Sequence, residues 1–219
     1  MIRGLATTFP DPVVGWNESK LEFFGLPKRS ETRCVVLHWT GGSNLGPGVF
    51  ETIHGRGLSV QFCVEPGGKV YQYCDADRRC AHAGSVDDDD GDGVVLSGNS
   101  CSIGIEIVNP AKVSAGGARA VARPLVSEKI HGQTKQATGF TSQQTQVVLK
   151  LVQVLCSAYG LPLRVPTAPD GDVLPTVMGE AAFKHFRGVC GHLHLTQRKR
   201  DPGLALLREV ANLQPLHSA

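Results

Sequence analysis

The sequence has no excess of charge of either sign and no long apolar run. Its 219 residues include 22 Lys and Arg against 20 Asp and Glu, which gives a formal net charge of +2. A balance this even provides no electrostatic reason to bind nucleic acid or a membrane surface. No stretch approaches the roughly 18 apolar residues that span a bilayer. We therefore expect neither a nucleic-acid partner nor insertion into a membrane.

The first residues and the cysteines lack the signs of secretion. The start, MIRGLATTFPDPVV, has neither the apolar core of roughly 7–15 residues nor the small-residue cleavage site of a signal peptide. The seven cysteines are an odd number and form no C-x-x-C pair. This pattern is typical of reduced, mostly buried thiols. We expect synthesis in the cytoplasm without a signal peptide, and another delivery route if the protein acts outside the cytoplasm.

The length suits a single domain, and 41% of the residues are hydrophobic, which is enough to form a core. Three prolines, Pro10, Pro12 and Pro27, argue against regular structure near the start. We therefore expect an N-terminal extension over residues 1–30, packed on one domain of residues 31–215.

Short apolar runs predict several strands. Residues 34–38 (CVVLH) form a compact run that a Thr-Gly-Gly loop closes. Residues 59–64 and 69–74 flank Glu-Pro-Gly-Gly, which is typical of a hairpin. In residues 102–107 the isoleucines occupy alternate positions, so Glu106 projects from the opposite face of the strand.

Helices are expected between and after these strands. The segment after Thr141 has apolar residues at helical spacing and stops at Gly-Leu-Pro over residues 160–162. Weaker patterns indicate helices over residues 47–55 and 203–213, with a last strand over 188–192. Residues 110–139 show no sustained periodicity and are expected to form a long surface loop. Strands mixed with packed helices predict an α/β domain with a central mixed β-sheet flanked by helices.

Taken one at a time, the candidate site residues leave the chemistry open. His38 ends a buried strand, a place where α/β proteins commonly bind ligands, but taken alone the pattern favours a structural histidine. His192 ends the last predicted strand, and Asp201 follows nine residues later before Pro-Gly, where aspartate often forms turns. Glu106 is an expensive choice on a strand of isoleucines unless its face lines a cleft.

Five segments occur in a fixed order along the chain: VVLHWTGG, SVQFCVEPGGKVYQYC, AHAG, CSIGIEIVN and GHLHLTQRKRDPG. They resemble the successive blocks of one family, the type 2 N-acetylmuramoyl-L-alanine amidases, whose fold is shared with peptidoglycan recognition proteins and some phage endolysins. Together they span roughly residues 33–212. The resemblance implies a lytic zinc hydrolase that cuts the amide bond between the lactyl group of muramic acid and L-alanine, in peptidoglycan or in muropeptides.

The resemblance also implies a role for each site residue. Zn²⁺ would be held by His38, His192 and Asp201, a set that leaves one coordination position for water. Glu106 matches the glutamate that acts as general base. Lys199 matches the lysine that stabilises the developing oxyanion.

The substrate groove would be lined by four further residues: Trp39, His82, Asn109 and Arg200. The segment LHLTQRKR departs from the family's usual Pro-Gly turn, so Arg198 or Arg200 could take the place of Lys199. His194 stands where the family has an aspartate; it could compete for the metal, but we favour support of the turn. Gln61 occupies a position often filled by histidine, which argues against a metal role there.

Two other motifs have simpler interpretations. Residues 88–93 match the start of a calcium-binding loop, but the twelfth position is Asn99 rather than glutamate, which favours a solvated acidic loop. A cysteine hydrolase using Cys190 or Cys101 is a further hypothesis. The apolar strand around Cys190 favours a buried thiol instead.

The main alternative to catalysis is a peptidoglycan-binding module of the same fold. Such binders typically lack the third zinc ligand, whereas Asp201 and Glu106 are both present here. We expect a monomer, with an immunity or delivery partner only if the protein is a secreted toxin. Phage endolysin, delivered effector and recycling amidase all stay open, as does the choice between intact sacculus and anhydro-muropeptide as substrate.

Overall fold

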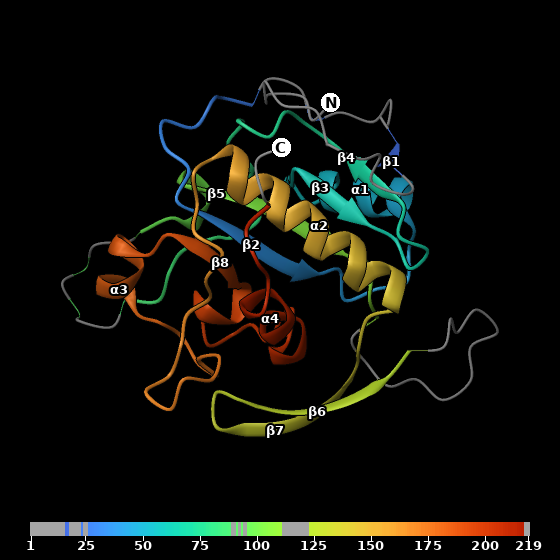
Figure 1. Cartoon of the computed structure of the whole chain (residues 1–219). Helices are drawn as coiled ribbons and strands as arrows, with labels where there is room; N and C mark the ends of the chain where they lie inside the picture. The colour runs from blue at the N-terminus through green and yellow to red at the C-terminus, as the bar shows by residue number, and fades with distance from the viewer. Residues whose placement is uncertain are drawn as a thin grey trace.

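A six-stranded mixed β-sheet forms the centre of the computed structural model (Figure 1). Only β3 and β4 pair antiparallel; the other neighbours run parallel. In spatial order the strands are β1 (Trp16–Asn17), β4 (Val70–Gln72), β3 (Phe62–Val64), β5 (Ser102–Ile107), β2 (Cys34–Trp39) and β8 (Gly188–Gly191). The structure describes residues 16–17, 23, 26–88, 91, 93, 96–110 and 123–216. The predicted α/β domain with a central mixed sheet is confirmed.

The alternation of side chains along β2 and β5 divides the sheet into two faces. Val35 and Leu37 lie in the main apolar cluster with the isoleucines of β5, under helix α2 (Ser142–Ala158). Cys34 and Val36 belong to a second cluster on the opposite face. Because successive strand residues point to opposite faces, His38 and Glu106 lie on the face away from α2.

Helix α2 forms where the apolar spacing predicted it. The Thr141 hydroxyl caps its N-terminus by accepting a hydrogen bond from the backbone amide of Gln144, and the Gln144 side-chain oxygen accepts one from the backbone amide of Thr141. This capping box satisfies two donors that the first turn leaves free. The buried side chains of α2 belong to the main apolar cluster, together with those of α4 (Leu204–Ala211). Figure 1 shows α2 lying across the sheet. The part of the chain that the structure describes also contains the α-helices α1 (Gly46–His54), close to its predicted range, and α3 (Glu180–His185).

The expectation of a surface loop over residues 110–139 is wrong in its second half. Strands β6 (Leu125–Ile130) and β7 (Gln133–Thr138) pair as an antiparallel hairpin beneath the main sheet in Figure 1. His131 and Gly132 form its turn, both with positive φ. Most of its side chains are at least partly exposed, so the sequence carries little apolar alternation. Residues 111–122 of the expected loop lie outside the described residues.

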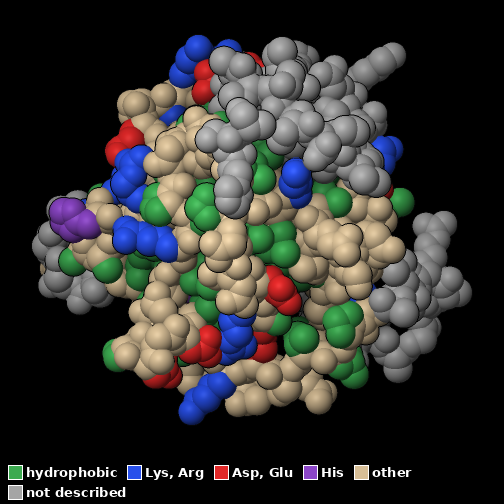
Figure 2. Space-filling view, in the orientation of Figure 1, with side chains coloured by type: hydrophobic (Ala, Val, Ile, Leu, Met, Phe, Trp, Pro, Cys, Tyr) green, Lys and Arg blue, Asp and Glu red, His purple; other side chains and the backbone are tan. Residues whose placement is uncertain are grey.

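The surface and the N-terminal segment add two observations. Figure 2 shows Lys and Arg mixed with Asp and Glu on the described part of one face, rather than gathered in one basic patch. Among the described residues, no helix is both long and apolar enough to cross a bilayer. Most of the expected extension over residues 1–30 lies outside the described residues. Within it, Phe23 stacks on Phe50 and meets Tyr73 edge-on.

Candidate metal centre

The sheet brings three separated segments to one place. Strand β2 pairs in parallel with β5 on one side, in a register that sets His38 opposite Glu106, and with β8 on the other side. The chain leaves β8 into a short 3-10 helix that starts at His192. The loop that follows returns Asp201 to the same spot just before α4. Because β2, β5 and β8 run parallel, their carboxyl ends meet at one end of the sheet, where α/β proteins commonly bind ligands.

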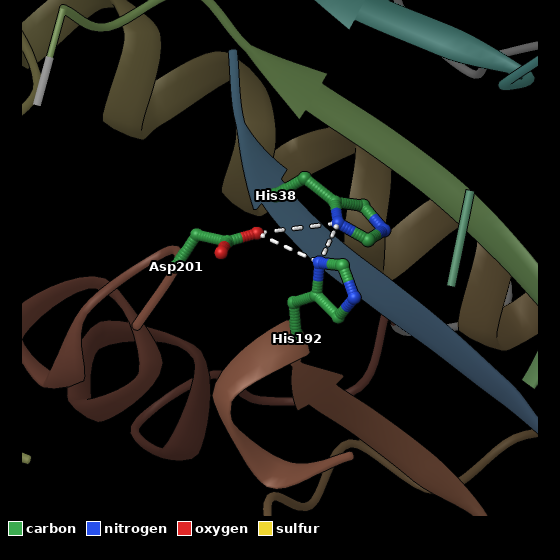
Figure 3. A group of neighbouring side chains, drawn as sticks. All are labelled: His38, His192 and Asp201. Carbon is green, nitrogen blue, oxygen red and sulfur yellow. Dashed lines mark hydrogen bonds and ion pairs between the residues drawn. The ribbon is translucent and has the colours of Figure 1, made fainter. Parts of the chain in front are cut away.

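Two imidazole nitrogens and one carboxylate oxygen converge there (Figure 3). His38 Nδ1 lies 3.0 Å from His192 Nδ1 and 3.3 Å from Asp201 Oδ2. His192 Nδ1 lies 3.2 Å from the same oxygen. All three residues are buried, with exposed fractions of 2%, 7% and 5% in chain order. They form the one such group of potential metal ligands found within the described residues.

The donor set fits a zinc ion. A tetrahedral site with bonds of 2.0–2.2 Å separates its ligand atoms by about 3.3–3.6 Å, close to the spacings seen here. Hydrogen bonds alone satisfy these three atoms poorly. If both Nδ1 atoms carried hydrogen to reach Asp201, the two N–H groups would face each other at 3.0 Å. A cation at the centre would satisfy all three atoms, and His38, His192 and Asp201 would be the residues that hold it.

The protonation states also suit metal binding. Burial lowers the pKa of His38 to about 4, despite the nearby Asp201 carboxylate that raises it. Burial alone would raise the pKa of Asp201, but its contacts with the His192 and His38 rings outweigh burial and hold this pKa well below its usual range. At neutral pH, His38 is therefore a neutral imidazole and Asp201 a carboxylate, the forms in which these side chains bind metals.

A cavity of about 180 Å³ opens from the cluster, and Glu106 and Lys199 help to line it. The Glu106 side chain is half-buried, and its Oε2 atom is shielded from solvent without a hydrogen-bond partner in the described part of the chain. Burial raises the pKa of Glu106 to about 8, assisted by the Asp201 charge and opposed by Lys199. The carboxyl therefore faces the site rather than the apolar interior.

The four residues expected to line the groove divide into two pairs. Trp39 and His82 are part of the cavity wall. Asn109 and Arg200 are not in that wall. The buried Asn109 amide donates to the carbonyls of Thr138 and Gly139.

Arg200 points instead to the β6–β7 hairpin. Its guanidinium donates to the carbonyls of Ile130, Glu128 and Gln133. The turn of the hairpin also reaches the adjacent residue, since His131 Nε2 donates to the Lys199 carbonyl at 2.7 Å. The sequence does not predict these contacts, because the residues that form the hairpin show no sustained periodicity.

The residues given simpler roles behave accordingly. His194 Nδ1 accepts from the Gly191 amide and its Nε2 donates to the Leu174 carbonyl, so it supports the turn. The Gln61 side chain donates to the Arg78 carbonyl and accepts from the Gly104 amide, outside the ligand cluster. All seven cysteines are buried and free, Cys190 within β8. Residues 89–90, 92 and 94–95 of the acidic segment lie outside the described residues.

Three side chains that could bind a metal, beside an open cavity, are the arrangement expected of a catalytic rather than a structural metal site. The family model described as Amidase_2, N-acetylmuramoyl-L-alanine amidase, matches residues 28–204. The chain therefore belongs to the N-acetylmuramoyl-L-alanine amidase type 2 family, and the resemblance noted from its sequence blocks is confirmed.

Solved structures with this fold include three at similar scores. AmiD from E. coli has a TM-score of 0.50 and 18% identity, covering 89% of this chain and 60% of its own. AmpDh3 from Pseudomonas aeruginosa has a TM-score of 0.50 and 17% identity, covering 89% and 65%. LysC from Clostridium intestinale URNW has a TM-score of 0.50 and 15% identity, covering 91% and 97%. At these identities the likeness shows the fold, and this chain spans 60% of the AmiD chain. Among curated proteins, none matches this sequence.

Proposed function

We propose that this protein is a zinc-dependent N-acetylmuramoyl-L-alanine amidase that hydrolyses the lactyl–L-alanine bond of peptidoglycan or its muropeptide fragments. The observation that carries this proposal is the convergence of His38, His192 and Asp201 at a cavity that Glu106 and Lys199 also line. Family membership supports the reaction type. The substrate class is supported by AmiD and AmpDh3, whose structures hold an anhydro-muramyl tripeptide and an anhydromuramic pentapeptide.

The zinc ion, when bound by these three side chains, would lower the pKa of a water molecule and polarise the amide carbonyl. In its ionised form, which the charge of a bound cation favours, Glu106 would accept a proton from the attacking water through its Oε2 atom, which has no hydrogen-bond partner within the described residues. It would return that proton to the nitrogen of L-alanine as the carbon–nitrogen bond breaks. The hydroxyl of the water stays on the lactyl carbonyl carbon, so the products are a lactyl carboxylic acid and a free amine, which ionise to a carboxylate and an ammonium group.

Lys199 would stabilise the negative charge that develops on the carbonyl oxygen. Its side chain lines the same cavity as Glu106, and its charge lowers the pKa of that carboxyl. A fixed cation near a developing oxyanion contributes about 3–4 kcal/mol when it is well placed. Arg200 is the weaker candidate for this role, because three backbone carbonyls of the hairpin already engage its guanidinium.

The experiment is product analysis on purified sacculi and on an anhydro-muropeptide, with the enzyme as isolated, after chelation and after zinc is restored. We expect mass spectrometry to find peptides with a free N-terminal alanine, lost on chelation and regained with zinc. Glu106→Gln serves as the matched inactive control.

The competing hypotheses predict different results. Binding to sacculi without cleavage, with zinc present, would favour the binding module. Cleavage that survives chelation and is lost only to a thiol-alkylating reagent would favour a cysteine hydrolase and contradict the zinc proposal.

A further inference from the structure

A chain of side-chain hydrogen bonds leads to His38 from the side opposite the ligand cluster. Ser102 Oγ lies 2.5 Å from the Gly98 carbonyl oxygen and 3.3 Å from His82 Nε2. The other nitrogen of that ring, His82 Nδ1, lies 2.9 Å from His38 Nε2. Ser102 and His38 lie on adjacent strands, β5 and β2, while His82 comes from the loop after β4. The contacts therefore join three elements behind the metal centre.

Counting hydrogens gives this chain a direction. A serine hydroxyl has a single hydrogen, and a carbonyl oxygen only accepts, so Ser102 donates to Gly98. Ser102 Oγ must then accept the hydrogen of His82 Nε2. A neutral His82 keeps its lone pair on Nδ1, which accepts from His38 Nε2. His38 is left with its lone pair on Nδ1, the atom that faces His192 and Asp201.

We propose that His82 is a positioning residue that, with Ser102, holds His38 in the tautomer whose Nδ1 lone pair faces the metal site. This inference rests on the proposed metal role of His38 and gives His82 a function besides any contact with substrate. Partners that hydrogen-bond the second nitrogen of a metal-binding histidine fix its tautomer and orientation in this way.

The local structure holds His82 firmly for this role. Asn99 Oδ1 accepts hydrogen bonds from three consecutive backbone amides, those of His82, Ala83 and Gly84, at 2.8–3.1 Å. Gly104 on β5 leaves room for the ring, since a Cβ at this position would lie 2.7 Å from His82 Cγ and Nδ1. The backbone of the loop and a missing side chain on the strand thus both determine where the ring lies.

The reverse direction has the opposite consequence. If His82 Nδ1 donated to His38 Nε2, His38 would carry its hydrogen on Nδ1 and direct it at Asp201. Ser102 would then have to donate its hydrogen to His82 Nε2 instead of the Gly98 carbonyl, or His82 would have to be protonated on both nitrogens and carry a positive charge beside the proposed cation site. Both alternatives lose a buried hydrogen bond or add like charge, and neither leaves His38 Nδ1 free to bind a metal.

Two measurements on the full-length protein test the inference. In the zinc-free protein labelled with ¹⁵N-histidine, two-bond proton–nitrogen correlations should show His38 protonated at Nε2. A zinc-chelator competition should show the dissociation constant rising about 10–100-fold in His82→Ala, the range found when such partners are removed. His82→Gln, whose side-chain oxygen can still accept from His38 Nε2, should recover most of the affinity.

His185→Ala, which removes an exposed histidine on α3, is the matched control and should bind zinc as the wild type does. Circular dichroism establishes that each variant is folded. A folded His82→Ala variant with wild-type zinc affinity, or His38 protonated at Nδ1, would overturn the inference. A wild-type protein that binds no zinc would instead overturn the proposed function, so the two failures are distinguishable.

Discussion

The two sides of the candidate metal centre are held in place by different means. His38 and Glu106 lie on neighbouring parallel strands, in direct register and within a continuous ladder of backbone hydrogen bonds. Lys199 and Asp201 lie on a loop, and side chains stabilise that loop from outside the main sheet. Of these contacts, Arg200 reaches three carbonyls of the β6–β7 hairpin, and His131 reaches the Lys199 carbonyl.

The comparison teaches where substitutions should be tolerated. On the strand side, backbone pairing between β2 and β5 sets the positions of His38 and Glu106. Replacing either side chain should therefore remove its chemical function without moving the neighbouring residues. On the loop side, Glu128 also accepts from the Ala205 amide at the start of α4, so the hairpin contacts both ends of the segment that carries Asp201. Changes to the hairpin should therefore alter the site from a distance.

The largest effect is expected from removing a metal ligand on either side. His38→Ala and Asp201→Ala each delete one of three convergent donors, and we expect near-complete loss of bound zinc with loss of turnover. Elemental analysis of the purified proteins measures this directly, beside His185→Ala. Stoichiometric zinc in either ligand variant would remove that residue from the site.

The second effect isolates the chemistry of the strand side. Glu106→Gln keeps the shape of the side chain but removes its ability to accept a proton. Turnover should fall by about 10²–10⁴-fold, the contribution typical of a general base. Zinc content and sacculus binding should match those of the wild type. Turnover within a factor of two of wild type would exclude the general-base role.

The third effect separates two adjacent cations on the loop side. Lys199→Ala should lower kcat by about 10²–10³-fold with zinc affinity unchanged, as expected for loss of an oxyanion-stabilising group. Arg200→Ala should lower both zinc affinity and the free energy of unfolding, the latter by about 1–3 kcal/mol, because it leaves hairpin carbonyls without their donor.

Arg198→Ala removes the neighbouring exposed cation and is the matched control for both variants. Steady-state kinetics, chelator competition and urea unfolding are measured for all three. If Arg200→Ala loses turnover but keeps its stability and zinc affinity, Arg200 rather than Lys199 is the oxyanion-stabilising residue.

The last prediction concerns the stability of the metal-free protein and its dependence on pH rather than turnover. The pKa of Glu106 is raised in the fold from about 4.5 to about 8, so the folded state holds a proton that the unfolded chain releases. Its contribution to stability is complete below pH 4.5 and is lost as the pH rises through 8. Relative to Glu106→Gln, the free energy of unfolding of the zinc-free wild type should fall by up to about 1.4 kcal/mol per pH unit across this window. Urea unfolding at pH 5, 7 and 9 measures the difference; a gap independent of pH would contradict the raised pKa.

Several features of this protein follow from local sequence alone. Alternating isoleucines in residues 102–107 place Glu106 on the opposite face of its strand, because side chains alternate in any extended chain. Helix α2 begins at Thr141 because the capping residues and the apolar spacing are contained within the segment itself. The ordered sequence blocks indicated the family, and the three side chains that the resemblance implies as metal ligands are the ones that converge in the structure.

Other features were decided only by tertiary structure. The β6–β7 hairpin has few buried side chains, so its strands are defined by their pairing and by contacts with residues about 70 positions away in the chain. For the same reason the sequence left Arg200 open as an alternative to Lys199, although the two side chains point to different surroundings. The contact between His82 and His38 joins residues 44 positions apart. The proposed role of His82 depends on which ring nitrogen of each histidine faces which neighbour. The path of the chain in three dimensions sets that geometry, and no local sequence pattern does.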